Sequence, residues 1–299
     1  MVVPDGPLAL VPFAGLRLTG SQPLAECATT VFFPGLSLLA PPGAQPRPQG
    51  AAARRAGPPS APGRVIAHAA APMFTERLTT LVEQAPLPVT VSEPMNRAEL
   101  REALLTATAH DVAVLFHHGD TAPDSASRGV RLADGGYLSA TTARRWNWPD
   151  TVVLGSCWAA HLLPTEADEP FGLPTACLLG GARSVIGGQA PILANKTVAT
   201  VIARVVVNSA QGERAAERLG TALSTLSRTA GVNPGPAAGW AGLTCWTTDP
   251  PPAAHRVADA WTPRTSHSTD EQPDVQGLPM SCARSAAPGP RRHNAWAAI

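Results

Sequence analysis

The sequence predicts an α/β fold in which a mostly parallel sheet carries helices on both faces. Short apolar runs of strand length alternate with segments whose apolar residues recur every three or four positions, as in amphipathic helices. The runs at 111–116 and 151–154 are apolar throughout, which is typical of strands covered on both faces. This alternation indicates β-α-β units, whose strands lie parallel. At 299 residues the chain is long enough for a large buried core.

The first 63 residues are predicted to contain two strand-forming segments and an insertion. Residues 1–16 read as a hairpin, with a Pro4-Asp5-Gly6 turn between apolar runs. Residues 30–33 form a short apolar strand. Residues 41–63 are almost entirely Pro, Gly, Ala, Gln and Arg without periodicity, which predicts a disordered insertion.

Two β-α units are expected between residues 64 and 110. A strand at 64–70 precedes a helix whose apolar stripe contains Phe74, Leu78, Leu81 and Val82. Prolines at 86 and 88 end that helix before a short strand at 89–91. Asn96 and Glu99 then have the spacing of an N-cap and capping box, which predicts a second helix with Leu100, Ala103, Leu104 and Ala107 on its apolar face.

The remaining elements continue the same alternation. Strands are predicted at 111–116, 151–154, 184–186 and 240–247, with a small hairpin at 131–137. Helices are predicted at 140–146, at 171–179 and along two apolar stripes, one from Val198 to Val206 and one from Ala215 to Leu226. Residues 250–299 lack periodicity and are predicted to be a disordered Pro/Ala-rich tail, so the folded domain is expected to span 1–249.

Composition excludes several classes of function. The formal net charge of +1 does not favour nucleic acid or an anionic membrane surface as a partner. Five widely spaced cysteines with no C-x-x-C pair predict neither a disulfide framework nor a metal site, and no sequence feature calls for a cofactor. No signal peptide or uncharged apolar run of about 18 residues is recognisable, so a cytoplasmic protein is expected. The sequence starts inside a pattern rather than before one.

Reactive side chains follow two of the predicted buried strands. His118 and Gly119 come after the strand at 111–116, and Cys157 comes after the strand at 151–154. The carboxyl ends of parallel strands meet at one edge of a sheet, where an imidazole could take the proton of a thiol nucleophile. The backbone N–H groups of Gly119 and Cys157 would then form an oxyanion hole. The structural alternative is a polar turn at 117–120 and a cysteine that simply belongs to the core.

The order and context of these motifs resemble the CHAT domain, a member of the caspase-like (clan CD) cysteine peptidases. VVPDGPLALVPFAGL near the start resembles the opening hairpin of that family, and LFHHGD at 115–120 resembles its His-Gly segment. VVLGSC at 152–157 and GLPTACLLGGARSVIGG at 172–188 resemble the nucleophile strand and the helix and strand that follow. The resemblance implies a caspase-like three-layer sandwich and peptide-bond hydrolysis by a dyad of Cys157 and His118, with His117 as a minor rival base.

The segment after Ile186 departs from the family pattern. Ala190 stands where a Trp is common, and Leu193 and Ala194 stand where acidic residues are common. The specificity pocket is expected to involve Asp120, Trp158, Gln189 and Ala190. The resemblance therefore implies a cysteine endopeptidase that acts on protein or peptide substrates. It also implies that a partner protein could regulate the activity. A catalytically inactive interaction or scaffold module of the same fold is the alternative.

Overall fold

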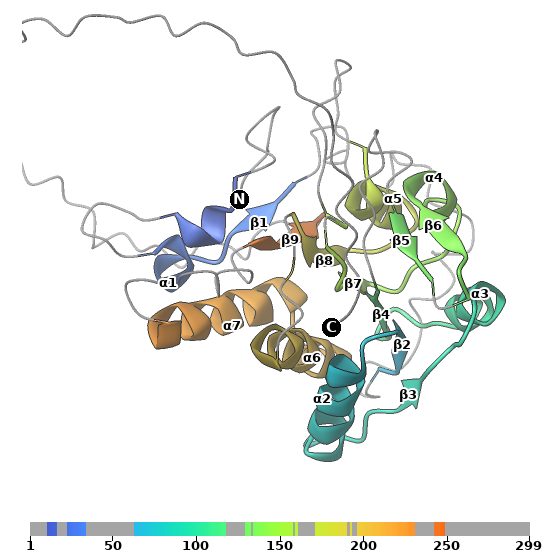
Figure 1. The fold of residues 1–299 in the computed structure, drawn as a ribbon, viewed down its shortest axis with the longest axis horizontal. Helices are drawn as coiled ribbons and strands as arrows, with labels where there is room; N and C mark the ends of the chain where they lie inside the picture. Colours follow the sequence, from blue (N-terminus) through green and yellow to red (C-terminus); the bar gives the residue numbers. More distant parts are fainter. Residues whose placement is uncertain are drawn as a thin grey trace, which may run out of the picture. The chain divides into compact units, whose positions relative to one another are not determined.

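A mostly parallel sheet with helices on both faces forms the centre of the computed structural model (Figure 1). The structure describes residues 11–16, 23–33, 63–117, 129–132, 134–157, 159–160, 171–189, 192, 196–230 and 242–248. The predicted insertion at 41–63, except Gly63, and the predicted tail at 250–299 lie outside the described residues.

Seven strands of the described chain form this sheet, in the order β1-β9-β8-β7-β4-β2-β3. Their bounds are β1 Val31–Phe32, β2 Val65–Ala69, β3 Val91–Ser92, β4 Val112–Phe116, β7 Thr151–Leu154, β8 Ser184–Gly188 and β9 Leu243–Thr247. All neighbouring pairs run parallel except β8 and β9, which are antiparallel. A separate antiparallel hairpin joins β5 Gly129–Arg131 to β6 Tyr137–Ser139.

Helices cover both faces of the sheet (Figure 1). The α2/α6 face carries α1 Leu24–Cys27, α2 Pro72–Glu83, α6 Lys196–Ala210 and α7 Ala215–Ala230. The α3/α5 face carries α3 Arg97–Leu105, α4 Ala140–Ala143, α5 Leu173–Leu179 and the β5–β6 hairpin. The α/β fold expected from the sequence is therefore confirmed.

The buried strands send alternate side chains into two cores. In β4, Val112, Val114 and Phe116 belong to the core on the α2/α6 face, whereas Ala113 and Leu115 belong to the core on the α3/α5 face. Successive side chains of a strand point to opposite faces, so a strand covered on both sides must be apolar at every position. This is why β4 reads as an unbroken apolar run.

Local differences from the predicted elements follow from tertiary contacts. Residues 13–15 form a short 3-10 helix where the hairpin was expected, because the ring of Phe13 packs edge-on against Phe32 at 5.5 Å. The rest of that predicted hairpin, residues 1–10, lies outside the described residues. Helix α4 ends at Ala143 rather than near Trp146, because the N–H of Arg144 is the last to bond four residues back, and those of Arg145 and Trp146 bond three residues back.

The predicted capping box of α3 is present in a modified form. The backbone N–H of Glu99 donates to Asn96 Oδ1 at 3.0 Å, as an N-cap requires. The Glu99 carboxylate, however, accepts from the Met95 backbone N–H and from the Asn96 side-chain amide. Asp134, from the β5–β6 turn, adds a third cap by accepting from the Arg97 backbone N–H at 3.0 Å.

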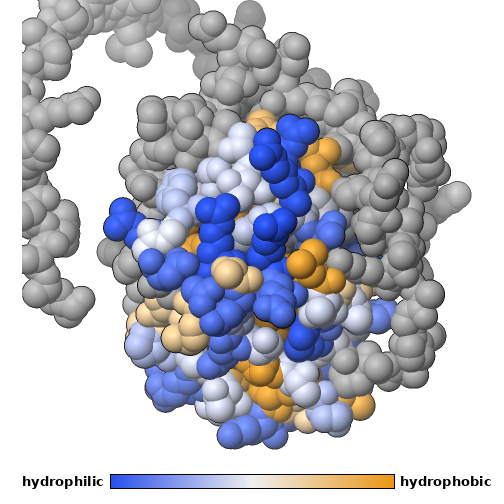
Figure 2. All heavy atoms as spheres, turned by 90° about the vertical axis from the view of Figure 1, so that its right-hand side faces the viewer, coloured by the Kyte–Doolittle hydropathy of each residue, from blue (hydrophilic) through white to orange (hydrophobic). Residues whose placement is uncertain are grey.

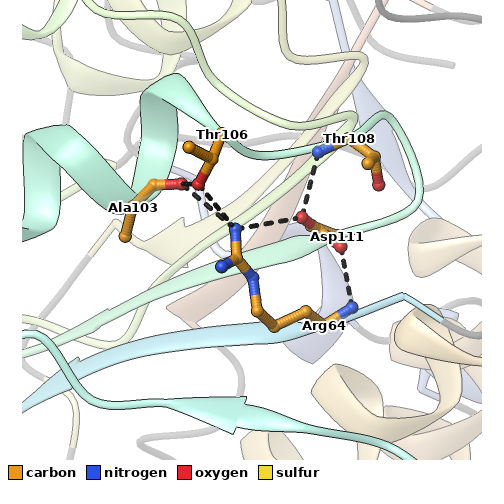
Figure 3. A network of polar contacts seen from close by, with 5 residues as sticks. All are labelled: Arg64, Ala103, Thr106, Thr108 and Asp111. Atoms are coloured by element: carbon orange, nitrogen blue, oxygen red, sulfur yellow. Dashed lines mark hydrogen bonds and ion pairs between the residues drawn. The ribbon is translucent and has the colours of Figure 1, made fainter.

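A polar network fixes the amino-terminal edge of the sheet (Figure 3). The Asp111 carboxylate accepts from the backbone N–H groups of Arg64 at 2.7 Å and Thr108 at 2.9 Å, and it pairs with the Arg64 guanidinium at 3.4 Å. The same guanidinium donates to the Ala103 carbonyl at 3.2 Å. Since every one of these groups has a partner within the fold, the network serves structure at the edge opposite the reactive side chains.

None of the helices within the described ranges has the length and apolar character needed to cross a membrane.

Candidate active site

Cys157 lies just beyond the carboxyl end of β7, on the α2/α6 face of the sheet. Val153 belongs to the core on that face, and the half-buried Cys157 packs against the same core. The intervening Gly155 also points this way, because a Cβ built on it would lie 2.3 Å from Phe116, a residue of that core. The strand alternation therefore continues through residues 153, 155 and 157 and presents the thiol at the edge of the sheet.

The backbone of Ile192 encloses the Cys157 thiol. The Ile192 N–H donates to Sγ at 3.3 Å, and Sγ donates to the Ile192 carbonyl oxygen at 3.5 Å. A neutral thiol can satisfy both groups, because it is a weak donor and a weak acceptor. A thiolate would keep the contact with the N–H but would be repelled by the carbonyl dipole. The Ile192 backbone thus supplies both a donor and an acceptor beside the thiol.

The β4 strand, which leads to the expected histidine, lies directly beside β7. The two strands are parallel, with Leu115 opposite Leu154, and the N–H of Gly155 donates to the Leu115 carbonyl at 2.8 Å. The His117 N–H donates to Ser156 Oγ at 3.2 Å, which joins the two chains beyond their last paired residues. His118, Gly119 and Asp120 lie outside the described residues.

His117 is buried on the face opposite Cys157. Its ring lies 4.5 Å from the ring of His68, at an angle of 42°. His68 follows Ile66 and Ala67 in β2, and the alternation of that strand puts it on the α3/α5 face. The position of the His117 ring therefore favours a packing role over that of a base for the Cys157 thiol.

His68 was not singled out from the sequence. It is 1% exposed, and its Nδ1 lies 2.5 Å from the Pro94 carbonyl oxygen. Because a carbonyl can only accept, Nδ1 carries the proton of this hydrogen bond. The signal that could have found His68 is the one that found His118, namely a histidine at the carboxyl end of a parallel strand.

Phe116 also escaped sequence reasoning, because it reads as an ordinary residue of a buried strand. Its ring stacks on Phe74 of α2 with centroids 4.5 Å apart and an interplanar angle of 9°. It also covers Gly155, which has no room for a side chain. The glycine two residues before Cys157 is thus fixed by an aromatic ring from the neighbouring strand.

Gln189 is the one residue of the expected specificity pocket that the described part of the chain includes. It directly follows β8, is 2% exposed, and its backbone N–H donates to the Gly242 carbonyl at 2.8 Å. Since β8 pairs with β7, Gln189 lies at the same edge of the sheet as Cys157. Trp158 and Ala190 lie outside the described residues, as do the acidic residues Asp168 and Glu169.

The other described cysteines have different environments from that of Cys157. Cys27 is exposed, whereas Cys177 and Cys245 are buried. Burial raises the pKa of the Cys177 thiol far above its ordinary range, so Cys177 stays protonated and unreactive. No three His, Cys, Asp or Glu side chains gather as metal ligands within the described ranges.

The CHAT domain family model matches residues 1–272 of this chain. The chain therefore belongs to the CHAT domain family, whose members are caspase-like proteins of clan CD and are related to cysteine peptidases. No curated protein matches the chain.

Proposed function

We propose that this chain is a cysteine endopeptidase in which Cys157 is the nucleophile and His118 is the general base. The observation that carries the proposal is the parallel pairing of β4 and β7, with Leu115 opposite Leu154. Positions 118 and 157 each follow these paired residues by three. An imidazole and a thiol that follow a pair of opposed residues on adjacent strands by the same number of positions are suited to a catalytic dyad.

The faces of the two strands favour His118 over His117 as the base. Phe116 and Cys157 belong to the α2/α6 face, whereas the His117 ring packs on the opposite face. In extended backbone, position 118 would share the face of Phe116, and therefore that of the thiol. The family resemblance of the LFHHGD segment supports the same choice.

The proposed reaction follows the chemistry of acyl transfer. His118 accepts the thiol proton while Cys157 Sγ attacks the scissile carbonyl, and the backbone N–H groups of Gly119 and Cys157 stabilise the oxyanion. Collapse of the tetrahedral intermediate breaks the C–N bond, and His118 protonates the leaving amine. Water, deprotonated by His118, then hydrolyses the thioester. Asp120, Trp158, Gln189 and Ala190 are proposed to contact the substrate side chain.

Enclosure of the thiol by Ile192 supports a regulated peptidase. The Ile192 carbonyl oxygen lies 3.5 Å from Sγ and opposes a negative charge on the sulfur. We propose that a regulatory partner protein relieves this contact. The proposal includes a cytoplasmic location, where thiols stay reduced.

Proteome-wide cleavage profiling tests this proposal. The full chain is expected to generate new protein amino termini, and Cys157→Ala and His118→Ala should abolish them, because each removes a member of the dyad. Cys27→Ser is the matched control, since it removes an exposed thiol of α1, a helix that packs against α7, and should leave cleavage unchanged. Cleavage that persists at full rate in Cys157→Ala would contradict the proposal.

An inactive scaffold is the second candidate, and the departure of the segment after Ile186 from the family pattern favours it. The rate of Cys157 alkylation, measured across pH, distinguishes the peptidase from the scaffold. The experiment uses a Cys27→Ser, Cys282→Ser background, which removes an exposed thiol and the thiol of the predicted tail. A peptidase predicts an apparent pKa below the roughly 8.5 of a free thiol, and His118→Ala should raise it. A rate that is independent of His118 would favour the scaffold.

A further inference from the structure

An elongated groove of about 410 Å³ lies between α6 and α7. These helices are consecutive in the chain, form a pair on the α2/α6 face and lie side by side in Figure 1. The groove runs from Lys196 at the start of α6 to Asn208 near its end, a distance of about 18 Å at the rise of an α-helix. We name it the α6–α7 groove.

The floor of the α6–α7 groove is apolar. Val201 and Val205 of α6 lie on it, separated by four residues and therefore on one side of the helix. Ala222 and Leu226 of α7 have the same spacing and line the opposite side. Both α7 residues are half-buried and so remain within reach of a ligand. Val201 and Val205 are almost fully buried, so the accessible apolar surface of the groove comes mainly from Ala222 and Leu226.

The rim of the groove is positively charged. Lys196, Arg204 and Arg218 line the groove, and no Asp or Glu is among the residues that line it. Arg218 pairs with Glu213. Lys196 and Arg204 are exposed, and neither makes an ion pair with any residue of the described ranges. Two cations about two helical turns apart on α6 thus remain available to carboxylates.

The threonine hydroxyls of the rim are not available to donate hydrogen bonds to a bound carboxylate. Thr200, Thr221 and Thr225 each donate their hydroxyl hydrogen to the carbonyl four residues earlier in their own helix, at 2.7, 3.0 and 2.9 Å respectively. Recognition of an anionic group would therefore rest on the lysine and the arginines.

We propose that the α6–α7 groove binds an acidic amphipathic helix of a partner protein. An apolar strip between two helices, bordered by cations, is complementary to a helix with leucine-like residues on one side and carboxylates beside them. A helix of about 12 residues would match the length of the groove. The proposal is independent of any peptidase activity at Cys157.

The face on the side of α3 is mostly hydrophilic, with apolar residues scattered over it (Figure 2). Arg101 and Arg145 are exposed and do not line the groove, and Arg101 stands next to Glu102 on α3. This face supplies the matched control for charge reversal.

Fluorescence anisotropy with the full chain tests the proposal. The probe is a labelled peptide of about 14 residues with leucine at every third or fourth position and glutamate elsewhere, and its match has lysine in place of each glutamate. The acidic peptide is expected to bind, more weakly at higher salt, and the basic one is not. Lys196→Glu with Arg204→Glu should weaken binding by about tenfold or more, because attraction becomes repulsion.

Two further variants keep the experiment decisive. Arg101→Glu with Arg145→Glu makes the same change of charge outside the groove and should leave binding unchanged. Thr221→Trp fills the groove without altering charge and should also abolish binding, while circular dichroism verifies that each variant is folded. The proposal would be overturned if the groove variant bound the peptide as tightly as the wild type, or if the control variant lost as much affinity as the groove variant. Complete displacement of the peptide by millimolar sulfate would also overturn it, because that would indicate a small-anion site only.

Discussion

At the scale of single residues, the reactive edge of the sheet depends on a contact that links β4 to β7. The ring of Phe116 lies over Gly155, and Gly155 stands two positions before Cys157. A methyl group at 155 would lie 2.3 Å from Phe116 Cδ2, well inside van der Waals contact. The ring cannot withdraw freely, because it is stacked on Phe74. The glycine is thus a packing requirement that also sets the position of the thiol.

Gly155→Ala is therefore expected to destabilise the fold by about 1–3 kcal/mol, the usual cost of forcing extra volume into a packed core. Phe116→Ala opens a cavity and lowers the free energy of unfolding by itself. In the Phe116→Ala variant, however, Gly155→Ala should lower the free energy of unfolding much less than it does in the wild type. Urea denaturation of the two single variants and the double variant measures this coupling. Strictly additive effects would show that the ring and the glycine do not constrain each other.

The surroundings of individual cysteines differ as well. Cys177 is fully buried in an apolar core, which raises the pKa of its thiol, whereas Cys157 is half-buried and contacts the polar backbone of Ile192. Both look alike in the sequence, each being a lone cysteine in an apolar segment. The difference arises from the surroundings that the fold supplies.

At the scale of elements, helix α3 is held by caps from two parts of the chain. Asn96 and Glu99 form the local cap, and Asp134 reaches the Arg97 N–H from the β5–β6 turn. Asp134 also accepts from the Gly136 N–H at 2.8 Å. These hydrogen bonds, that to Arg97 foremost, lower the pKa of the Asp134 carboxyl below the ordinary value of 3.8. The ionised form of Asp134 is thus the one that the fold favours.

The contribution of Asp134 should consequently depend on pH. Because the folded-state pKa is lowered, the stabilisation is complete above the unfolded pKa and is lost as the pH falls through the folded-state value. Asp134→Ala should lower the urea midpoint at pH 6, and the gap from wild type should narrow below about pH 4. Glu102→Ala, which removes an exposed carboxyl from α3, the helix that Asp134 caps, is the control. A gap that persists unchanged to pH 3 would argue against the capping role.

At the scale of the whole molecule, the sheet is completed by segments distant in sequence. β1 pairs with β9, so residues 31–32 lie beside residues 245–246. Phe32 is fully buried between Phe13 and Trp246, with ring centroids 5.5 Å and 5.0 Å away. Helix α1 packs against α7 in the same region. The early part of the chain is therefore built into the core that the later strands form.

Phe32→Ala should destabilise the entire domain by about 3–5 kcal/mol, as expected for truncating a fully buried aromatic side chain. Unfolding followed by tryptophan fluorescence and by circular dichroism should shift together, because one sheet joins both halves of the chain. Leu105→Ala, on an exposed side chain of α3, should have little effect. Separate transitions by the two probes would indicate that the β1 edge unfolds independently.

The sequence alone determined the class of fold and the strands on which the candidate site is built. Apolar runs covered on both faces and helices with regular stripes are local patterns. The strands predicted at 111–116, 151–154 and 184–186 therefore appear in the structure, at 112–116, 151–154 and 184–188. The capping residues Asn96 and Glu99 are equally local. The proximity of the strand ends at Phe116 and Leu154 also followed, because parallel strands share their carboxyl edge.

Only the tertiary structure decided which side chains surround Cys157. The pairing of Sγ with Ile192, the Phe116 ring over Gly155 and the burial of His117 against His68 join residues that are 35 to 49 positions apart. No periodicity in the sequence encodes such contacts, because they depend on strand order and on the face each residue takes. The α6–α7 groove has the same origin, since each helix shows its own stripe but only their packing brings the two stripes together.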